Sequence, residues 1–177
     1  MKKTTTLDYI ILGLIQENAL SGYRIRKTFE DTALGNFGGS PGTIYPALNR
    51  LEQNKLISKQ NLKESTKSEY SITHLGLDHL KVWLEQPPSA EEIKKSQELP
   101  VLKFAFMNPL MGREQQIQYL DSLKHGLEEY LLELQNYFNT EKEDMPVTGR
   151  LAFEHGLLTY RASITWCELA KKSLINS

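Results

Sequence analysis

Cysteine, long apolar runs and net charge are all scarce in this chain of 177 residues. Cys167 is the single cysteine, so an internal disulfide and a cysteine-rich zinc site are both excluded. The apolar run at 9–15 is far too short to cross a membrane. Lys2 and Lys3 precede it as in a signal peptide, but no small-residue cleavage site follows, and we expect a cytoplasmic protein. The formal net charge of −1 excludes a histone-like polycation.

The sequence also lacks the spacings that catalytic and cofactor sites need. Its four histidines are scattered and do not have the i, i+4 spacing of two zinc ligands on one helix. The glycines between 35 and 42 form neither a dinucleotide-binding nor a P-loop pattern. Cys167 follows Trp166 on an apolar stripe, which predicts a buried thiol rather than a nucleophile. We therefore expect no enzyme, no metal site and no cofactor.

Pro87 and Pro88 mark the clearest boundary in the chain. Two consecutive prolines cannot continue a helix, and they stiffen the backbone into an extended form. We predict two domains, 1–86 and 87–177. Their formal charges are +2 and −3, so the first domain is the better candidate for contact with a polyanion.

The first domain is predicted to contain three short helices, a β-hairpin and a further helix. Apolar residues recur at helical spacing over 7–15 and again over 41–54, and Ser21-Gly22 opens a helix between them. Alternation over 69–72 predicts a half-buried strand that pairs with the segment after Leu56. This order of elements is typical of a winged helix-turn-helix.

The second domain is predicted to be wholly helical. Ser89 and Glu92 form an S-x-x-E capping box, which predicts that a helix starts there and that Pro100 interrupts or kinks it. A coiled-coil-like pattern follows over 113–139, and a last helix is expected over 149–174.

Both long helices carry an apolar stripe, and a stripe of this kind needs a partner, which a symmetric dimer would supply. The stripe of the first consists of Ile117, Leu120, Leu127, Leu131, Leu134 and Phe138. The stripe of the second consists of Leu151, Leu158, Ala162, Trp166 and Leu169.

The third helix, at 41–54, has a polar face suited to DNA. Its apolar stripe leaves Asn49, Arg50 and Gln53 on the opposite face, with Tyr45 at the flank. Such side chains donate and accept hydrogen bonds at base edges, and Arg50 has the donors to pair with a guanine or a phosphate. The alternative is an ordinary solvated helix face. Nearby cations favour DNA, and they are Arg24, Arg26, Lys27, Lys55, Lys59, Lys63 and Lys67.

Three motifs of the first domain resemble the PadR family of bacterial transcriptional regulators. They are S-G-Y-R-I at 21–25, P-G-T-I-Y-P-A-L-N-R-L at 41–51 and K-S-E-Y-S-I-T-H-L-G at 67–76. The resemblance is strong over 7–80 and loose beyond. Lys55 stands where the family commonly has glycine.

The resemblance implies a mainly α-helical fold: an N-terminal winged helix-turn-helix with a small two-stranded β-wing, then an all-α dimerisation and effector domain. It implies a homodimer that binds an inverted-repeat operator in double-stranded DNA, most often as a repressor. The residues whose motif positions match the DNA-facing ones are Thr43, Tyr45, Asn49 and Arg50, with Lys67 at the wing.

Two further residues start the second helix of the motif. Ser21 and Tyr23 are expected to touch the DNA backbone, or alternatively to serve as a helix cap and a core residue. Because the wing lacks an arginine tip, phosphate contact by lysine is expected there rather than minor-groove reading.

Members of the family often release DNA when they bind a small molecule, which is aromatic in several cases. His155, Tyr160, Arg161 and Trp166 are the candidates to line such an effector pocket. The alternative is that these aromatic residues only pack in the core and the dimer seam.

A different function is also consistent with the sequence. A winged helix can bind protein, with the helical half as a coiled-coil adaptor and no DNA. The near-neutral net charge favours this alternative, whereas the local cations and the polar helix face favour DNA.

Overall fold

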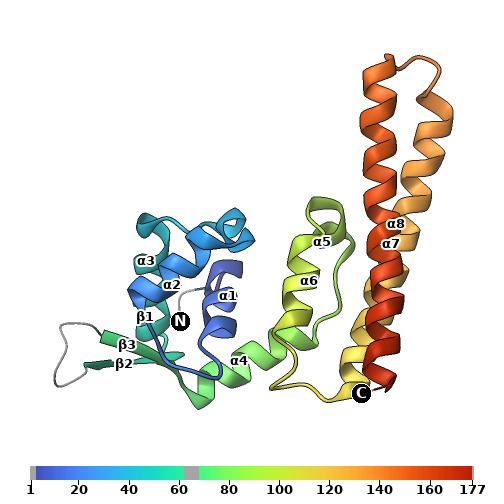
Figure 1. Ribbon diagram of the computed structural model, residues 1–177. Helices are drawn as coiled ribbons and strands as arrows, with labels where there is room; N and C mark the ends of the chain where they lie inside the picture. Colours follow the sequence, from blue (N-terminus) through green and yellow to red (C-terminus); the bar gives the residue numbers. More distant parts are fainter. Residues whose placement is uncertain (1–2, 62–67, 177) are drawn as a thin grey trace. The chain divides into compact units, whose positions relative to one another are not determined.

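The computed structural model describes residues 3–61 and 68–176, and Figure 1 shows the arrangement of its helices and strands. The fold is mainly helical with one small sheet, as the sequence predicts. None of the helices in the described ranges is both long and apolar enough to cross a bilayer. The elements are α1 (Thr6–Leu14), β1 (Leu20–Ser21), α2 (Gly22–Asp31), η1 (Ala33–Phe37), α3 (Pro41–Gln53), β2 (Ile57–Asn61), β3 (Ser68–Ile72), α4 (His74–Glu85), α5 (Ala90–Lys95), α6 (Glu98–Ala105), α7 (Arg113–Glu141) and α8 (Val147–Asn176).

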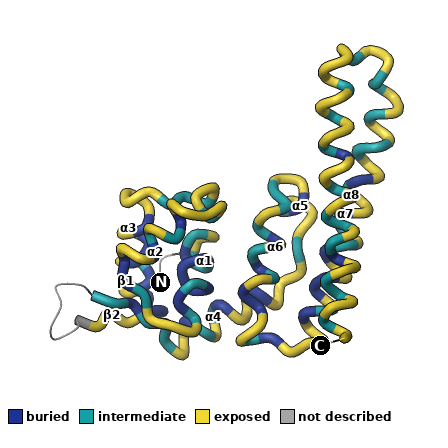
Figure 2. Tube along the Cα trace, in the orientation of Figure 1, coloured by how far each residue is buried: buried dark blue, intermediate teal, exposed yellow. Residues whose placement is uncertain are grey.

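The chain forms two compact units, Met1–Trp83 and Leu84–Ser177. The division falls inside α4, slightly before the boundary expected from Pro87 and Pro88. Each unit has its own buried residues (Figure 2).

The core of the first unit lies between α1, α2, α3 and the sheet. Helix α1 is almost entirely apolar, and Ile10, Ile11 and Leu12 are fully buried. Helices α2 and α3 are amphipathic and bury only one side each. The stacked rings of Tyr9 and Trp83, whose centroids are 4.8 Å apart, join α1 to α4.

The sheet has three strands in the order β1-β3-β2, where the sequence predicts two. Strands β2 and β3 form the expected antiparallel hairpin, with Ile57 opposite Ile72. The additional strand β1 pairs Leu20 with Tyr70. It is only two residues long, so it shows no alternation of polar and apolar residues that could reveal it.

A tight connection leads from α3 into β2. Lys55 has a φ of 60°, the left-handed conformation that favours glycine. Thr73 closes the connection by donating from its hydroxyl to the Lys55 carbonyl (2.8 Å), and it accepts from the Gly76 N–H (3.0 Å). A Cβ at Gly76 would lie 2.1 Å from the carbonyl oxygen of Leu56, so no larger residue fits there.

The second unit begins with two short helices. The capping box is present, since the Glu92 N–H donates to the Ser89 hydroxyl (3.2 Å) and the Ser89 N–H to the Glu92 carboxylate (2.8 Å). Helix α5 ends at Lys95 and α6 starts at Glu98, so Pro100 lies in the first turn of α6 rather than in a kinked longer helix. Proline is tolerated in a first turn because its missing N–H would have no helical partner.

Helices α7 and α8 pack against each other as a hairpin (Figure 1). Leu120, Leu127 and Leu131 of the predicted α7 stripe are buried, and α8 of the same chain supplies a partner for them. Two ion pairs join the helices, Lys124 with Glu168 (2.8 Å) and Lys171 with Asp121 (2.7 Å).

The predicted stripe of α8 does not pack on α7. Leu157 and Cys167 are the residues that α8 buries, and at 100° per residue the predicted stripe lies on the opposite side. Leu151, Leu158 and Leu169 are each more than half exposed. The predicted stripe therefore has the expected period, and it lies largely exposed rather than packed on α7.

Lys103 is an unexpected buried cation. Its ammonium donates to the carbonyl of Gln86 (3.0 Å) and lies 5.9 Å from the centre of the Tyr119 ring. Burial lowers the pKa of Lys103. The Tyr119 hydroxyl donates to the Pro100 carbonyl (2.9 Å), so both polar groups of this site have partners.

The conformation of Lys55 generates a stability prediction. We expect Lys55→Gly to raise the free energy of unfolding by about 0.5–1 kcal/mol, because glycine adopts a positive φ without steric cost. Urea denaturation measures this change. Lys55→Ala is the control, since alanine keeps the strain. An equal gain from both variants would show that loss of the lysine charge, not the backbone, is responsible.

The burial of Cys167 generates a reactivity prediction. Burial raises the pKa of its thiol to about 11, and the side chain is almost fully enclosed. At about pH 8 the thiolate fraction is then roughly a hundredfold below that of an ordinary cysteine, and access is blocked as well. We expect a disulfide reagent to label the folded chain at least about a hundredfold more slowly than the chain in concentrated guanidinium. Comparable rates would contradict the burial.

Candidate nucleic-acid interface

The start of α3 is held by Pro41 and by hydrogen bonds from Thr43 to the preceding turn. Pro41 occupies the first turn, where its fixed φ suits a helix. The Thr43 hydroxyl donates to the carbonyls of Ser40 (2.9 Å) and Gly38. Pro46 lies beyond the first turn, inside the helix, and leaves the Gly42 carbonyl without its helical N–H donor. Thr43 is exposed, but its hydroxyl already holds the turn before α3.

The opposite sides of α3 differ completely in burial. Ile44, Ala47, Leu48 and Leu51 are fully buried. Tyr45 and Asn49 are exposed, as predicted, and Tyr45 is 44% exposed. Their amide and hydroxyl groups are therefore available to an external partner such as a base edge or a phosphate.

The start of α2 shows how Ser21 and Tyr23 are placed. Ser21 is buried and caps α2, because its hydroxyl accepts from the Arg24 N–H (3.3 Å). Tyr23 is 51% exposed and is not a core residue. Its ring lies 5.4 Å from the guanidinium of Arg26, which pairs with Glu30.

Three tyrosines lie around one shallow hollow of about 210 Å³. Tyr23 comes from α2, Tyr45 from α3 and Tyr70 from β3, and Ser68 also lines the hollow. Burial raises the pKa of the Tyr70 hydroxyl. Gly22 permits the close approach, because a Cβ there would lie 3.1 Å from the ring of Tyr45. The hollow brings the predicted residues Tyr23 and Tyr45 together with Tyr70, a residue of the 67–76 motif that was not among the predicted site residues.

Positive charge borders this surface. Arg24 and Lys27 on α2 and Lys59 on β2 are exposed, and they form no ion pair with any residue in the described ranges. Lys67, the cation predicted at the wing, lies outside the described residues, so its role stays a prediction.

Arg50 points to the interior of the unit instead. Its Nε and Nη2 donate to the two oxygens of Asp8, at 2.8 and 2.6 Å. The side chain of Asp8 is fully buried, and that of Arg50 is 23% exposed. The hydrogen bonds to Asp8 raise the pKa of Arg50. A direct pairing of Arg50 with DNA would compete with this ion pair. The clue in the sequence was Asp8, an acid inside an otherwise apolar helix.

The four residues proposed for an effector pocket lie in different surroundings. Tyr160 packs edge-on against Tyr130 and donates to the Ile93 carbonyl (3.2 Å), and Trp166 packs edge-on against Phe104. His155 is exposed. The structure therefore does not bring the four together, and the two aromatic residues have the packing role that was the alternative.

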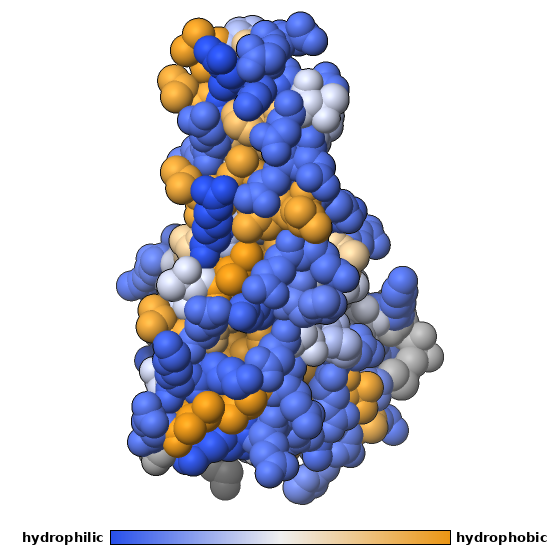
Figure 3. Space-filling view, turned by 90° about the vertical axis from the view of Figure 1, so that its right-hand side faces the viewer, coloured by the Kyte–Doolittle hydropathy of each residue, from blue (hydrophilic) through white to orange (hydrophobic). Residues whose placement is uncertain are grey.

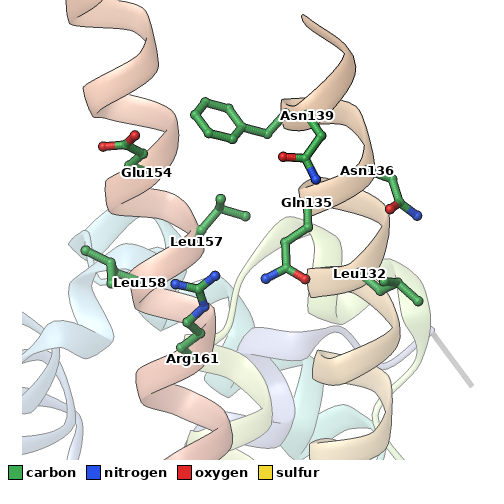
Figure 4. Close-up of a pocket in the computed structure, with 9 residues that line it drawn as sticks. Leu132, Gln135, Asn136, Asn139, Glu154, Leu157, Leu158 and Arg161 are labelled. Atoms are coloured by element: carbon green, nitrogen blue, oxygen red, sulfur yellow. The ribbon is translucent and has the colours of Figure 1, made fainter. Parts of the chain in front are cut away.

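Arg161 lines a groove between α7 and α8 instead. The groove has a volume of about 710 Å³. Leu158 and Glu154 lie about one and two turns from Arg161 along α8, and Gln135 and Leu132 lie on α7 (Figure 4). The groove combines apolar and polar side chains but contains none of the other three candidates.

The three helices, the antiparallel hairpin after α3 and the small third strand define a winged helix-turn-helix. Residues 11–82 match the model of the "Transcriptional regulator PadR-like family". Over these residues the chain matches this family of transcriptional regulators, as its motifs predicted.

Two named proteins are similar to the chain in sequence. The chain is 32% identical over 122 residues to the negative transcriptional regulator PadR of Bacillus subtilis, which covers 67% of this chain and 65% of that protein. It is 33% identical over 86 residues to the transcriptional regulator YqjI of Escherichia coli, which covers 49% and 41%. The matched segments therefore span less than two thirds of either relative.

Crystal structures of Bacillus subtilis PadR also align with the chain. The complex with operator DNA aligns over 96% of this chain and 99% of that chain, at 24% identity and a TM-score of 0.46. The complex with p-coumaric acid aligns over the same shares, at 25% identity and a TM-score of 0.43.

Proposed function

We propose that the chain is a repressor that binds double-stranded operator DNA as a homodimer. The observation that carries the proposal is the exposed face of α3, where Tyr45 and Asn49 lie opposite a fully buried apolar side. A helix of this kind fits the major groove, which is about 12 Å wide. The sequence similarity to a relative named as a negative regulator supports repression.

The DNA contacts divide into two kinds. Asn49 reads base edges, since its side-chain amide offers a donor and an acceptor. Tyr23, Arg24, Lys27 and Lys59 contact phosphates at the borders of the groove, because they are exposed and carry hydroxyl or cationic groups. Tyr45 lines the same hollow as Tyr23, next to the base-reading residue Asn49 on α3.

The exposed stripe of α8 supports the dimer. Leu151, Leu158 and Leu169 lie along one line of the helix, and each is more than half exposed. Figure 3 shows hydrophobic side chains among the polar ones on the long helices. Burial of each leucine would contribute about 1.5–3 kcal/mol. A symmetric dimer through this stripe would present two α3 helices to an inverted repeat.

Ligand control and location follow from the same proposal. The repressor would act in the cytoplasm, where an operator is accessible, and a small aromatic molecule would be the releasing effector. The groove beside Arg161 supports this effector more than the original set of four residues does, because Arg161 offers a cation next to apolar side chains.

A protein-interaction adaptor is the second candidate function. The net charge of −1 favours it, because a chain without an overall positive field has little long-range attraction to DNA. The adaptor function predicts that the chain binds a protein partner through α3 and does not distinguish one DNA duplex from another.

The DNA proposal predicts a salt dependence of defined size. If Arg24, Lys27 and Lys59 of both protomers contact phosphate, log K should fall with log salt concentration with a slope of about −5 or steeper. Fluorescence anisotropy with the DNA upstream of the chain's own gene measures the slope, and a scrambled duplex tests selectivity. The double variant Arg24→Ala/Lys27→Ala should reduce the slope by about 3 to 4.

Lys172→Ala is the matched control, because Lys172 is exposed but belongs to the second unit. It should leave the slope unchanged. Equal binding of both duplexes, with no effect of the α2 cations, would instead favour the adaptor.

The dimer proposal predicts the effect of one charge on α8. Leu151→Glu should weaken self-association by at least about tenfold, because it places a carboxylate in an apolar interface. Analytical ultracentrifugation measures the dissociation constant. Ala152→Glu is the control, since Ala152 is exposed about 100° around the helix from Leu151. Equal weakening by both variants, or by neither, would place the dimer seam elsewhere.

A further inference from the structure

We propose that Asp8 and Arg50 form a positioning pair that fixes the orientation of α3 for sequence-selective DNA binding. The inference rests on the proposed DNA-binding function. It assigns a role in DNA recognition to Asp8, an acidic residue that does not touch DNA. It also assigns to Arg50 a role in holding α3 rather than in reading bases.

The carboxylate of Asp8 is fixed to the start of α1. Its Oδ2 accepts from the Thr5 N–H (2.8 Å), and the Asp8 N–H donates to the Thr5 hydroxyl (3.4 Å), so the two residues form a capping box. The side chain of Asp8 is fully buried. A carboxylate held in this way cannot change rotamer without breaking the cap of α1.

Arg50 connects this fixed carboxylate to α3. Its planar guanidinium makes two parallel hydrogen bonds to Asp8, and Nη2 also donates to the Thr5 hydroxyl (3.4 Å). A bidentate pair defines both distance and direction, which a single point charge does not. The start of α1 therefore determines where residue 50 of α3 lies.

The position of residue 50 determines how the reading face is presented. Asn49 is the adjacent residue, and Tyr45 and Asn49 are one turn apart on the same side. The burial of apolar side chains on α3, such as Leu48 and Leu51, is non-directional, and it would tolerate small rotations of the helix. The ion pair removes this freedom. Buried ion pairs are often near neutral in stability, so a role in geometry is the more direct explanation for one at this place.

The sign of the charge change makes the proposal testable. Asp8→Asn removes a negative charge from the DNA-binding unit, so electrostatics alone would strengthen DNA binding. The positioning role predicts the reverse: affinity for the selected duplex falls at least about tenfold, while affinity for a scrambled duplex is unchanged or rises. Glu52→Gln is the matched control, because it removes a carboxylate from the exposed side of α3, and it should not weaken binding.

The assay uses the full chain and a duplex that the unmodified chain has enriched from a random DNA library. Binding is measured at a temperature where circular dichroism shows every variant to be folded, so that a loss of stability alone does not change the measured affinity. Arg50→Lys provides a second test, since it keeps the charge but loses the bidentate geometry, and it should also lower the ratio of selected to scrambled affinity. It replaces Asp8→Asn if that variant does not fold.

Three results would overturn the proposal. Binding by Asp8→Asn as tight as that of Glu52→Gln would show that the pair does not position α3. An Arg50→Met variant whose salt slope falls by about one per protomer, with unaltered selectivity, would make Arg50 a phosphate contact. Failure of the unmodified chain to enrich any sequence would remove the proposed DNA-binding function, and with it this inference.

Discussion

The first unit depends on the burial of one side of α3. Four side chains on that side are fully buried, and the three larger ones, Ile44, Leu48 and Leu51, each contribute about 1.5–3 kcal/mol through their removal from water. The helix cannot turn over without exposing them, so its polar side has to face outward. Residues between the buried positions, such as Tyr45 and Asn49, stay exposed to solvent because their neighbours pack in the core. The functional surface of α3 is thus a consequence of its apolar stripe.

The same principle explains how much of the fold the sequence predicts. Hydrophobic periodicity and capping residues are local signals, and they correctly located α3, the hairpin and the capping box at Ser89. Strand β1 is too short to have a period. The face of α8 that meets α7 could not be chosen either, because Leu151 and Leu157 are equally apolar and lie on different sides of the helix. Only the partner helix decides between them.

The candidate site also shows that local sequence signals cannot identify the partner of a side chain. Tyr45 and Asn49 were found because an exposed polar position on a helix follows directly from its period. Arg50 has the same apparent exposure in a helical projection, yet its side chain is long enough to reach a carboxylate on α1. Whether a cation meets DNA or an internal acid depends on a contact between residues 42 positions apart. A motif match cannot show that contact, although the unusual acid in the α1 run pointed to it.

These pairings also change how the charge of the first unit should be counted. Arg26 and Arg50 each face a carboxylate, whereas Arg24, Lys27 and Lys59 are exposed and form no ion pair with described residues. Formal charge treats all five alike, but counterion release requires cations that can approach phosphate. A nearly neutral chain can therefore present a locally positive surface. Carboxylates neutralise Arg26 and Arg50, whereas Arg24, Lys27 and Lys59 stay exposed to water. The near-neutral total is then weak evidence for an adaptor, and the arrangement around α3 is the stronger argument for DNA.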